Sequence, residues 1–166
     1  MITQHKEWFE TRFQTLVRGA YSQTGELDDV IRYILSGEGK RVRALLTIAA
    51  AEAFGGDRNR SFAAAAAIEF VHAYSLVHDD LPCMDDDDTR RGRPTAHVAF
   101  NEANALLGGD AILADAFGLL TSDNFRGVPL HPIGCDVQLK LVQHLSHAIG
   151  STGMVLGQVR DLYWTG

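Results

Sequence analysis

The chain has 166 residues, of which 46% are hydrophobic and 22% are charged, and its net charge is −6. This composition is typical of one globular domain with a core and excludes a disordered chain. The negative charge gives no general attraction to nucleic acid or to anionic lipid. Two cysteines are too few for a disulfide framework, and the N-terminus does not have the pattern of a signal peptide. We therefore expect a cytoplasmic protein without a membrane span.

The first half of the sequence predicts helices. Apolar residues recur at spacings of three and four over residues 3–18, which is typical of an amphipathic helix. Shorter apolar segments predict helices over residues 27–35 and 42–54, and glycines follow each of them. A further helix is expected over residues 60–78, and it must end before Pro82, because the residue before a proline avoids the helical region.

The second half predicts more helix and two loops. The "GGD" stretch inside the longest helix is expected to interrupt it. No segment shows sustained alternation of period two, so no strand is predicted. The expected elements are a loop over residues 81–94, a helix over 98–120 interrupted at 108–110, a loop over 121–134, and helices over 137–149 and 154–162.

Several of these helices are rich in alanine and apolar almost all round, which is typical of the inside of a larger all-α bundle. Such helices need further helices to cover them. The sequence therefore predicts that residues 1–166 are the N-terminal portion of a single larger domain. A complete small bundle, or an oligomer that buries the open face, is the alternative.

The stretch "LVHDDLPCMDDDDTRRGR" at residues 76–93 places six carboxylates directly after an apolar helix. Asp79 and Asp80 fall at the helix C-terminus, where the macrodipole disfavours anions and the two carboxylates repel each other. A cation would offset both costs, and Mg²⁺ is commonly held by one or two carboxylates plus substrate phosphates. Because the guanidinium groups of Arg90 and Arg91 can bind phosphate bidentately, the stretch predicts a diphosphate clamp.

Two alternatives compete with this interpretation of the acidic stretch. A solvated acidic loop is the first, and Asp86 to Asp88 fit it best. A calcium loop of the EF-hand type is the second. It fits poorly, because such a loop needs carboxylates at alternate positions, a central glycine and a terminal glutamate.

A second anion site is predicted upstream in "SGEGKRVRALL". Gly37 and Gly39 permit a turn with unusual dihedral angles, and basic residues follow at the start of a helix. Backbone N–H groups at that helix N-terminus, together with Lys40 and Arg43, can bind an anion. The spacing of a Walker A loop is absent. The alternative is a helix start whose basic side chains are solvated.

Through these motifs the sequence resembles the trans-prenyltransferases, or short-chain polyprenyl diphosphate synthases, and among them the bacterial farnesyl diphosphate synthases. The resemblance covers residues 37–162, in the order and spacing of the family. The matching stretches are "GEGKRVRALL", "EFVHAYSLVHDDLPCMDDDDTRRGRPTAH", "NEANALLGGDAIL" and "GMVLGQVRDL". It implies an all-α isoprenoid-synthase bundle with a deep cavity, in which isopentenyl diphosphate is condensed with dimethylallyl or geranyl diphosphate through an allylic carbocation.

The resemblance also implies roles for individual residues. The allylic diphosphate is expected beside Arg90, on Mg²⁺ held by Asp79, Asp80 and Asp85. The residues implied for isopentenyl diphosphate are Lys40, Arg43, His72 and Arg91, and Gln158 and Asp161 are the last residues that match. His72 would donate a hydrogen bond to phosphate, and a packed helix histidine is the alternative.

Tyr74 and Ser75 are the implied determinants of product length. Tyr74 lies five residues before Asp79, roughly 7.5 Å along a helix, where its ring would obstruct a growing prenyl tail. An aromatic residue at this position suits a C15 product. A core aromatic is the alternative, and the two roles are compatible.

The sequence departs from the family pattern in several places. Glu38 replaces a usual glycine and Ala44 replaces a frequent proline. The later K-T motif, F-Q pair and second Asp-rich motif of the family are absent, so we expect little turnover by this chain alone. The alternative function is a non-catalytic truncated paralogue or subunit that binds diphosphate or assembles with a full-length synthase. Family members are commonly dimers, so a homodimer or another self-association is expected.

Overall fold

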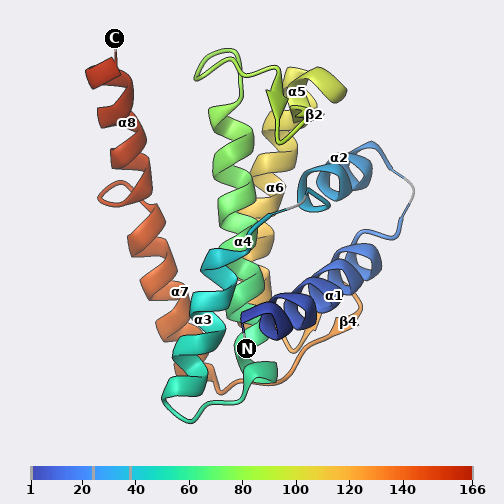
Figure 1. The fold of residues 1–166 in the computed structure, drawn as a ribbon, viewed down its shortest axis with the longest axis vertical. Helices are drawn as coiled ribbons and strands as arrows, with labels where there is room; N and C mark the ends of the chain where they lie inside the picture. The colour runs from blue at the N-terminus through green and yellow to red at the C-terminus, as the bar shows by residue number, and fades with distance from the viewer. Residues whose placement is uncertain (1, 24, 38, 166) are drawn as a thin grey trace. The chain divides into compact units, whose positions relative to one another are not determined.

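The computed structural model describes residues 2–23, 25–37 and 39–165 and divides into two compact units, Met1–Pro132 and Ile133–Gly166, each described here by itself. The helices of the first unit are α1 (Ile2–Ala20), α2 (Glu26–Leu35), α3 (Val42–Ala53), α4 (Arg58–Asp79), α5 (Ala96–Ala99) and α6 (Glu102–Thr121). Those of the second are α7 (Cys135–Ile149) and α8 (Met154–Thr165). The all-α fold class is confirmed (Figure 1).

The first unit is built around α4, which packs along α6 on one side and against α3 on another (Figure 1). Asp57 caps the start of α4, where its carboxylate accepts a hydrogen bond from the backbone N–H of Asn59 at 2.8 Å. The small side chains of Ala65, Ala66 and Ala67 are fully buried. They allow neighbouring helices to approach α4 from several directions.

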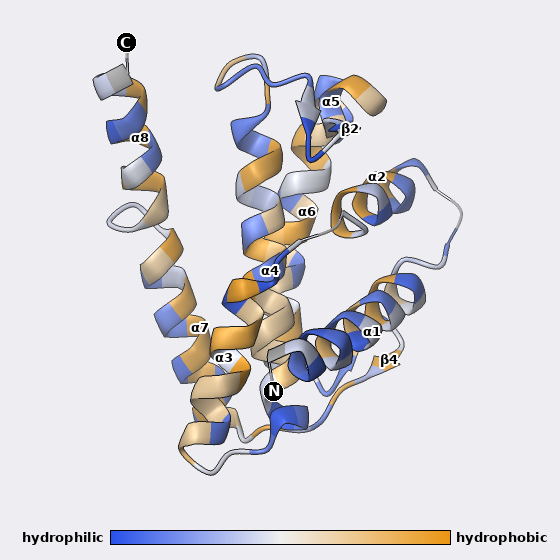
Figure 2. Cartoon of the chain, in the orientation of Figure 1, coloured by the Kyte–Doolittle hydropathy of each residue, from blue (hydrophilic) through white to orange (hydrophobic). Residues whose placement is uncertain are grey.

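Aromatic side chains join α1 to α4. Phe13 of α1 meets Phe70 of α4 edge to face, with ring centroids 5.8 Å apart. Phe70 also contacts Phe125, at 6.3 Å. In Figure 2 the exposed face of α1 is largely hydrophilic, whereas α3 and the adjoining turns of α4 are coloured hydrophobic. The buried aromatic rings therefore hold an amphipathic α1 on the central helix.

The interruption expected at residues 108–110 is wrong, because α6 is continuous from Glu102 to Thr121. A β-carbon on Gly108 would stand 2.7 Å from the γ1 carbon of Val30 on α2. A β-carbon on Gly109 would overlap the imidazole of His78 on α4. The two glycines allow α6 to pack closely between two helices, and the packing outweighs their low helix propensity.

Two short hairpins occupy the predicted loops, so the expectation of no strand is wrong at these two turns. The first pairs β1 (Thr89–Arg90) with β2 (Arg93–Pro94), and the second pairs β3 (Asn124–Phe125) with β4 (Val128–Pro129). Each turn is an Arg-Gly dipeptide with positive φ at both residues, the conformation of a type I′ turn. Two-residue strands are too short to show a periodic pattern.

By length and composition, α6 is the one helix in the described part of the chain that could cross a membrane. Seven of its residues are nevertheless buried, among them Ala105, Ile112, Ala116 and Leu119. It contacts α4, α2 and α5. We therefore assign α6 to the core of the first unit.

Candidate functional site

The Asp-rich stretch folds back on the end of α4. Asp79 is the last helical residue and Asp80 caps the helix. The backbone N–H of Asp85 donates to the carbonyl oxygen of Asp79 at 2.8 Å, and that of Asp86 donates to the carbonyl oxygen of Leu81 at 3.2 Å. The side chain of Leu81 is buried and anchors this turn. The predicted ligands Asp79 and Asp85 therefore lie close together in the backbone.

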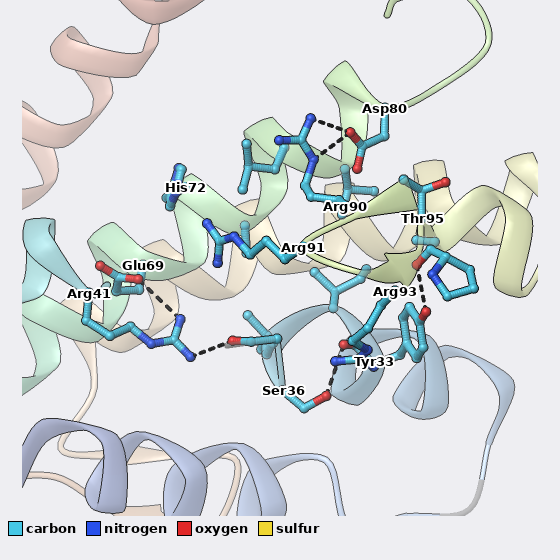
Figure 3. Close-up of a pocket in the computed structure, with 18 residues that line it drawn as sticks. Tyr33, Ser36, Arg41, Glu69, His72, Asp80, Arg90, Arg91, Arg93 and Thr95 are labelled. Atoms are coloured by element: carbon cyan, nitrogen blue, oxygen red, sulfur yellow. Dashed lines mark hydrogen bonds and ion pairs between the residues drawn. The ribbon is translucent and has the colours of Figure 1, made fainter. Parts of the chain in front are cut away.

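Asp80 is paired with Arg90, as Figure 3 shows. The Asp80 carboxylate is only 4% exposed and accepts from the Nε of Arg90 at 2.7 Å, and their ion pair closes to 2.6 Å at Nη2. The hydrogen bond to Asp80 raises the pKa of Arg90. Arg90 also pairs with Asp87 at 3.4 Å. Asp80 and Arg90 thus neutralise each other in this arrangement.

Ligation of Mg²⁺ by Asp79, Asp80 and Asp85 stays a prediction. Among the described residues, no group of three His, Cys, Asp or Glu side chains is close enough to hold a metal ion. The donor chemistry still fits Mg²⁺, because this ion is held by one or two carboxylates when substrate phosphates supply the remaining ligands. Asp79 and Asp85 would be the two carboxylate ligands. Asp80 would be a third ligand if Arg90 left its ion pair with Asp80 to bind a phosphate.

The hairpin pocket, about 480 Å³, lies between the β1–β2 hairpin, the end of α2 and one face of α4 (Figure 3). The hairpin is fixed to α2, because the Tyr33 hydroxyl donates to the carbonyl oxygen of Pro94 at 2.7 Å and Arg93 stacks over the Tyr33 ring at 4.3 Å. The lining of the hairpin pocket includes His72 and Leu76 of α4 and the capping residue Asp80, but not Asp79.

The basic pocket, about 920 Å³, adjoins the hairpin pocket and is lined by residues of α1, the start of α3 and α4. His72 and Arg91 line both pockets, as do Arg41 and Glu69. The cationic side chains of the basic pocket are Lys6, Lys40, Arg41, Arg43 and Arg91, and its carboxylates are Glu10 and Glu69. Such a pocket is suited to a multiply charged anion.

Arg41 is buried and forms ion pairs, unlike the basic residues Lys40 and Arg43 beside it. It contacts Glu10 at 2.8 Å and Glu69 at 3.3 Å, and donates to the carbonyl oxygen of Gly37 at 3.0 Å. Burial alone would lower the pKa of Arg41, but the hydrogen bonds and charges of Glu10 and Glu69 together outweigh it and raise the pKa. Lys40 and Arg43 are exposed and form no ion pair with any described residue. They are therefore available to an anion.

His72 stands between the two pockets (Figure 3). Burial, followed by the charges of Arg43 and Arg91, lowers the pKa of His72 to about 4. The imidazole is therefore neutral at pH 7. One ring nitrogen of a neutral imidazole carries a proton and can donate to a phosphate oxygen.

Arg91 reaches the basic pocket from the hairpin turn, where it adopts a φ of 53°. A β-carbon on Gly39 would stand 3.0 Å from the Nη1 of Arg91. Glycine at position 39 therefore lets the guanidinium approach the loop that carries Lys40. In this way the chain brings together the residues predicted for one diphosphate, Lys40, Arg43, His72 and Arg91.

Comparison with known proteins identifies the family. A model described as polyprenyl synthetase matches residues 24–166. The chain belongs to this family. It is 48% identical over 136 residues to geranylgeranyl pyrophosphate synthase 11, chloroplastic, of Arabidopsis thaliana, covering 82% of this chain and 37% of that protein. It is 37% identical over 161 residues to the farnesyl diphosphate synthase of Micrococcus luteus, and this match covers 97% of this chain and 53% of that protein.

A solved structure agrees with this assignment to the polyprenyl synthetases. The geranyltransferase of Legionella pneumophila aligns with a TM-score of 0.86 at 37% identity, over 97% of this chain and 55% of that one. The isoprenoid-synthase fold implied by the sequence is thus confirmed. The chain spans about a third to a half of the length of the curated relatives it matches.

Tyr74 and Ser75, which the polyprenyl synthetase resemblance implies as determinants of product length, lie on α4. The ring of Tyr74 packs against His78 at 4.6 Å, and the Ser75 hydroxyl donates to the His72 carbonyl oxygen at 3.0 Å. Neither residue lines a pocket described above. Gln158 and Asp161 lie in α8 of the second unit. Glu38 lies outside the described residues.

Sequence reasoning missed three residues of the basic pocket, Lys6, Glu10 and Glu69. A signal for Glu69 was present, since a lone carboxylate inside an apolar helix must be paired if it is buried. Glu69 is 4% exposed and bonds Arg41, and its other oxygen accepts from the backbone N–H of Ala44 at 3.3 Å. Lys6 and Glu10 sit on the polar face of α1, where nothing in the sequence distinguishes them.

Proposed function

We propose that the protein is a Mg²⁺-dependent prenyltransferase that condenses isopentenyl diphosphate with dimethylallyl or geranyl diphosphate and forms farnesyl diphosphate. One observation carries the proposal: two pockets adjoin at His72 and Arg91. The hairpin pocket reaches the acidic end of α4, while the basic pocket has an excess of cations. Two diphosphates bound in this way would bring their carbon chains into reach of each other.

The allylic diphosphate binds at the acidic end, beside Arg90. Asp79 and Asp85, with Asp80, would hold Mg²⁺ there, and the metal would supply positive charge to the phosphate oxygens. The bond between C1 and oxygen breaks, and its electron pair leaves with the diphosphate. Arg90 stabilises the charge that develops on the leaving group. The remaining allylic cation is attacked by the double bond of isopentenyl diphosphate, and loss of a proton completes the product.

Isopentenyl diphosphate binds in the basic pocket. Lys40, Arg43 and Arg91 contribute charge, and neutral His72 donates a hydrogen bond. Arg41 is excluded from this role, because Glu10 and Glu69 already pair with it. The proposal therefore uses the two basic residues of "KRVR" that are exposed, Lys40 and Arg43.

The farnesyl product is the finer part of the proposal. It rests on Tyr74, which lies on α4 five residues before Asp79 and whose ring packs on His78. The relatives carry both names, geranylgeranyl synthase for the Arabidopsis protein and farnesyl synthase for the Micrococcus protein. Chromatography of the products distinguishes a C15 from a C20 prenyl chain.

The proposed location is cytoplasmic and the proposed assembly is a homodimer or another self-association. Cys83 and Cys135 are both exposed and form no disulfide, which suits a reducing compartment. The Arabidopsis relative is named as chloroplastic. Self-association is supported by large apolar side chains on the surface, since Leu46 is 65% exposed and Phe54 is 93% exposed.

The same exposed apolar side chains favour a second candidate function, a non-catalytic subunit that assembles with a full-length synthase. The deciding assay incubates the chain with geranyl diphosphate, isopentenyl diphosphate and Mg²⁺, alone and with such a synthase. We expect little turnover by the 166-residue chain alone. Robust farnesyl diphosphate formation would refute that expectation, and stable co-purification with the synthase would favour the subunit.

Binding is tested separately from turnover by thermal unfolding with Mg²⁺ and inorganic pyrophosphate. A ligand that binds the folded chain raises its stability by RT ln(1 + [L]/Kd). We expect a clear rise of the melting temperature at millimolar pyrophosphate. No rise would overturn the diphosphate site, and stabilisation by Ca²⁺ without phosphate would favour a calcium-binding acidic loop instead.

A further inference from the structure

The basic pocket has more positive charge than the residues matched to the family motif supply. Its lining contains five cationic side chains and two carboxylates, Glu10 and Glu69. His72 adds no charge at pH 7, because burial and the nearby arginines lower its pKa to about 4. The described lining residues therefore carry three more formal positive charges than negative ones. This number matches a diphosphate group, which carries about three negative charges near neutral pH, two of them on its terminal phosphate.

The fifth cation is Lys6, which comes from α1, before the part of the chain that the family model matches. Lys6 is exposed and forms no ion pair with any described residue at contact distance. Glu10, one turn further along α1, is held by Arg41 at 2.8 Å. Although burial opposes it, the hydrogen bond from Arg41 and, more weakly, the charge of Lys6 lower the pKa of Glu10. Lys6 forms no ion pair with Glu10, so its ammonium group can also contact a ligand.

The position of α1 is fixed relative to the pocket. Arg41 joins Glu10 of α1 to Glu69 of α4 and stacks over the Phe13 ring of α1 at 4.8 Å. Phe9 and Phe13 are fully buried. The first turns of α1 are therefore held beside the basic pocket, and the side chain of Lys6 contributes to its lining.

We infer that Lys6 is a further substrate-binding residue, which contacts the diphosphate in the basic pocket from α1. This inference rests on the proposed function, because it assigns the anion of that pocket to a diphosphate. Lys6 would add a contact from α1 to those made by the hairpin residue Arg91. The substrate diphosphate would then be held by cations from three separate elements, α1, the start of α3 and the β1–β2 hairpin.

The test measures binding of inorganic pyrophosphate by titration calorimetry in EDTA, so that no metal-dependent binding at the acidic end contributes. The variants are Lys6→Gln, Lys6→Arg and, as a matched control, Arg18→Gln, which removes one exposed positive charge from the same helix outside both pockets. We expect Lys6→Gln to raise Kd about three- to tenfold, Lys6→Arg to restore binding, and Arg18→Gln to leave Kd within about twofold.

The results distinguish a failure of the inference about Lys6 from a failure of the proposed diphosphate site. If the unmodified chain binds pyrophosphate and Lys6→Gln matches Arg18→Gln, the role of Lys6 is overturned and the proposed function survives. If the unmodified chain binds no pyrophosphate, the basic pocket is not a diphosphate site and both fail. The melting temperature without ligand should be the same for all variants. A lower value for Lys6→Gln would assign the residue a structural role, through Glu10, and overturn the inference.

Discussion

Gly109 of α6 packs directly against the imidazole of His78 on α4, so closely that a β-carbon would overlap the ring. His78 immediately precedes Asp79, and its Nε2 lies 3.2 Å from the carbonyl oxygen of Leu106 and 3.8 Å from a carboxylate oxygen of Asp110. The last turn of α4, which carries the acidic end of the site, is thus fixed to α6 by one glycine and one histidine.

Gly109→Ala should therefore destabilise the first unit. The added methyl group forces the His78 ring away from α6, and overpacking of this kind costs about 1–3 kcal/mol. Urea unfolding followed by circular dichroism measures the change. Gly157→Ala in α8 is the matched control, because nothing lies within 4 Å of its β-carbon position. The control should be neutral or slightly stabilising, and equal stability of the two variants would contradict the packing argument.

Arg41 and Arg43 should respond differently to substitution. Arg41→Met leaves the buried carboxylate of Glu69 without its ion pair, and breaking a buried pair costs about 3–5 kcal/mol. Arg43→Gln changes an exposed side chain and should alter the free energy of unfolding by less than about 0.5 kcal/mol, while weakening pyrophosphate binding. Denaturant unfolding and calorimetry separate the two effects. A mild effect of Arg41→Met on unfolding would show that Arg41 is not structural.

The difference between Arg41 and Arg43 could not be predicted from the sequence. In "KRVR" they are the same residue type two positions apart, yet Arg41 is buried and Arg43 is exposed. The difference depends on a φ of 51° at Arg41 and on Glu10 and Glu69, which are far away in the sequence. Local pattern contains no information about such distant partners.

The helices, by contrast, were largely predictable. Apolar periodicity and the proline after α4 placed residues 60–78 within one turn of the observed Arg58–Asp79. The expectation failed at Gly108 and Gly109, since low helix propensity predicts a break while close packing against Val30 and His78 requires glycine. Propensity acts locally, and the packing that overrides it comes from other helices.

The two hairpin arginines form a second matched pair. Arg91 and Arg126 both adopt a φ near 50°, at 53° and 50°, and each precedes a glycine. Asparagine tolerates this conformation better, and Asn-Gly is the preferred type I′ turn. Arg126, however, lies 3.2 Å from Asp28, which is 8% exposed, and 3.7 Å from Asp115.

We therefore expect Arg126→Asn to destabilise the first unit by about 1–3 kcal/mol, because the buried Asp28 loses its charged partner. Arg91→Asn should affect unfolding less and should mainly weaken pyrophosphate binding. Thermal unfolding and calorimetry measure the two quantities. If Arg91→Asn proved the more destabilising of the two, the assignment of Arg126 to structure and of Arg91 to the ligand would be wrong.

His72 gives a prediction for the dependence of stability on pH. Above pH 6.5 the imidazole is neutral in both the folded and the unfolded chain and contributes nothing. Between pH 6.5 and about 4, His72 is protonated in the unfolded chain but stays neutral in the folded chain. Burial, followed by the charges of Arg43 and Arg91, lowers the pKa of His72 in the folded chain. This proton favours unfolding, so the contribution of His72 to stability decreases as the pH falls through that window.

The variant His72→Asn lacks this contribution. Between pH 7 and pH 5 it should lose about 1 kcal/mol less stability than the unmodified chain, a value reduced because solvent screens a half-exposed ring. Urea unfolding at the two pH values measures the difference, and parallel losses would contradict it. Pyrophosphate should also raise the pKa of His72 in an NMR titration, because the bound anion offsets the charges of Arg43 and Arg91. An unchanged titration with pyrophosphate bound would mean that the anion binds elsewhere.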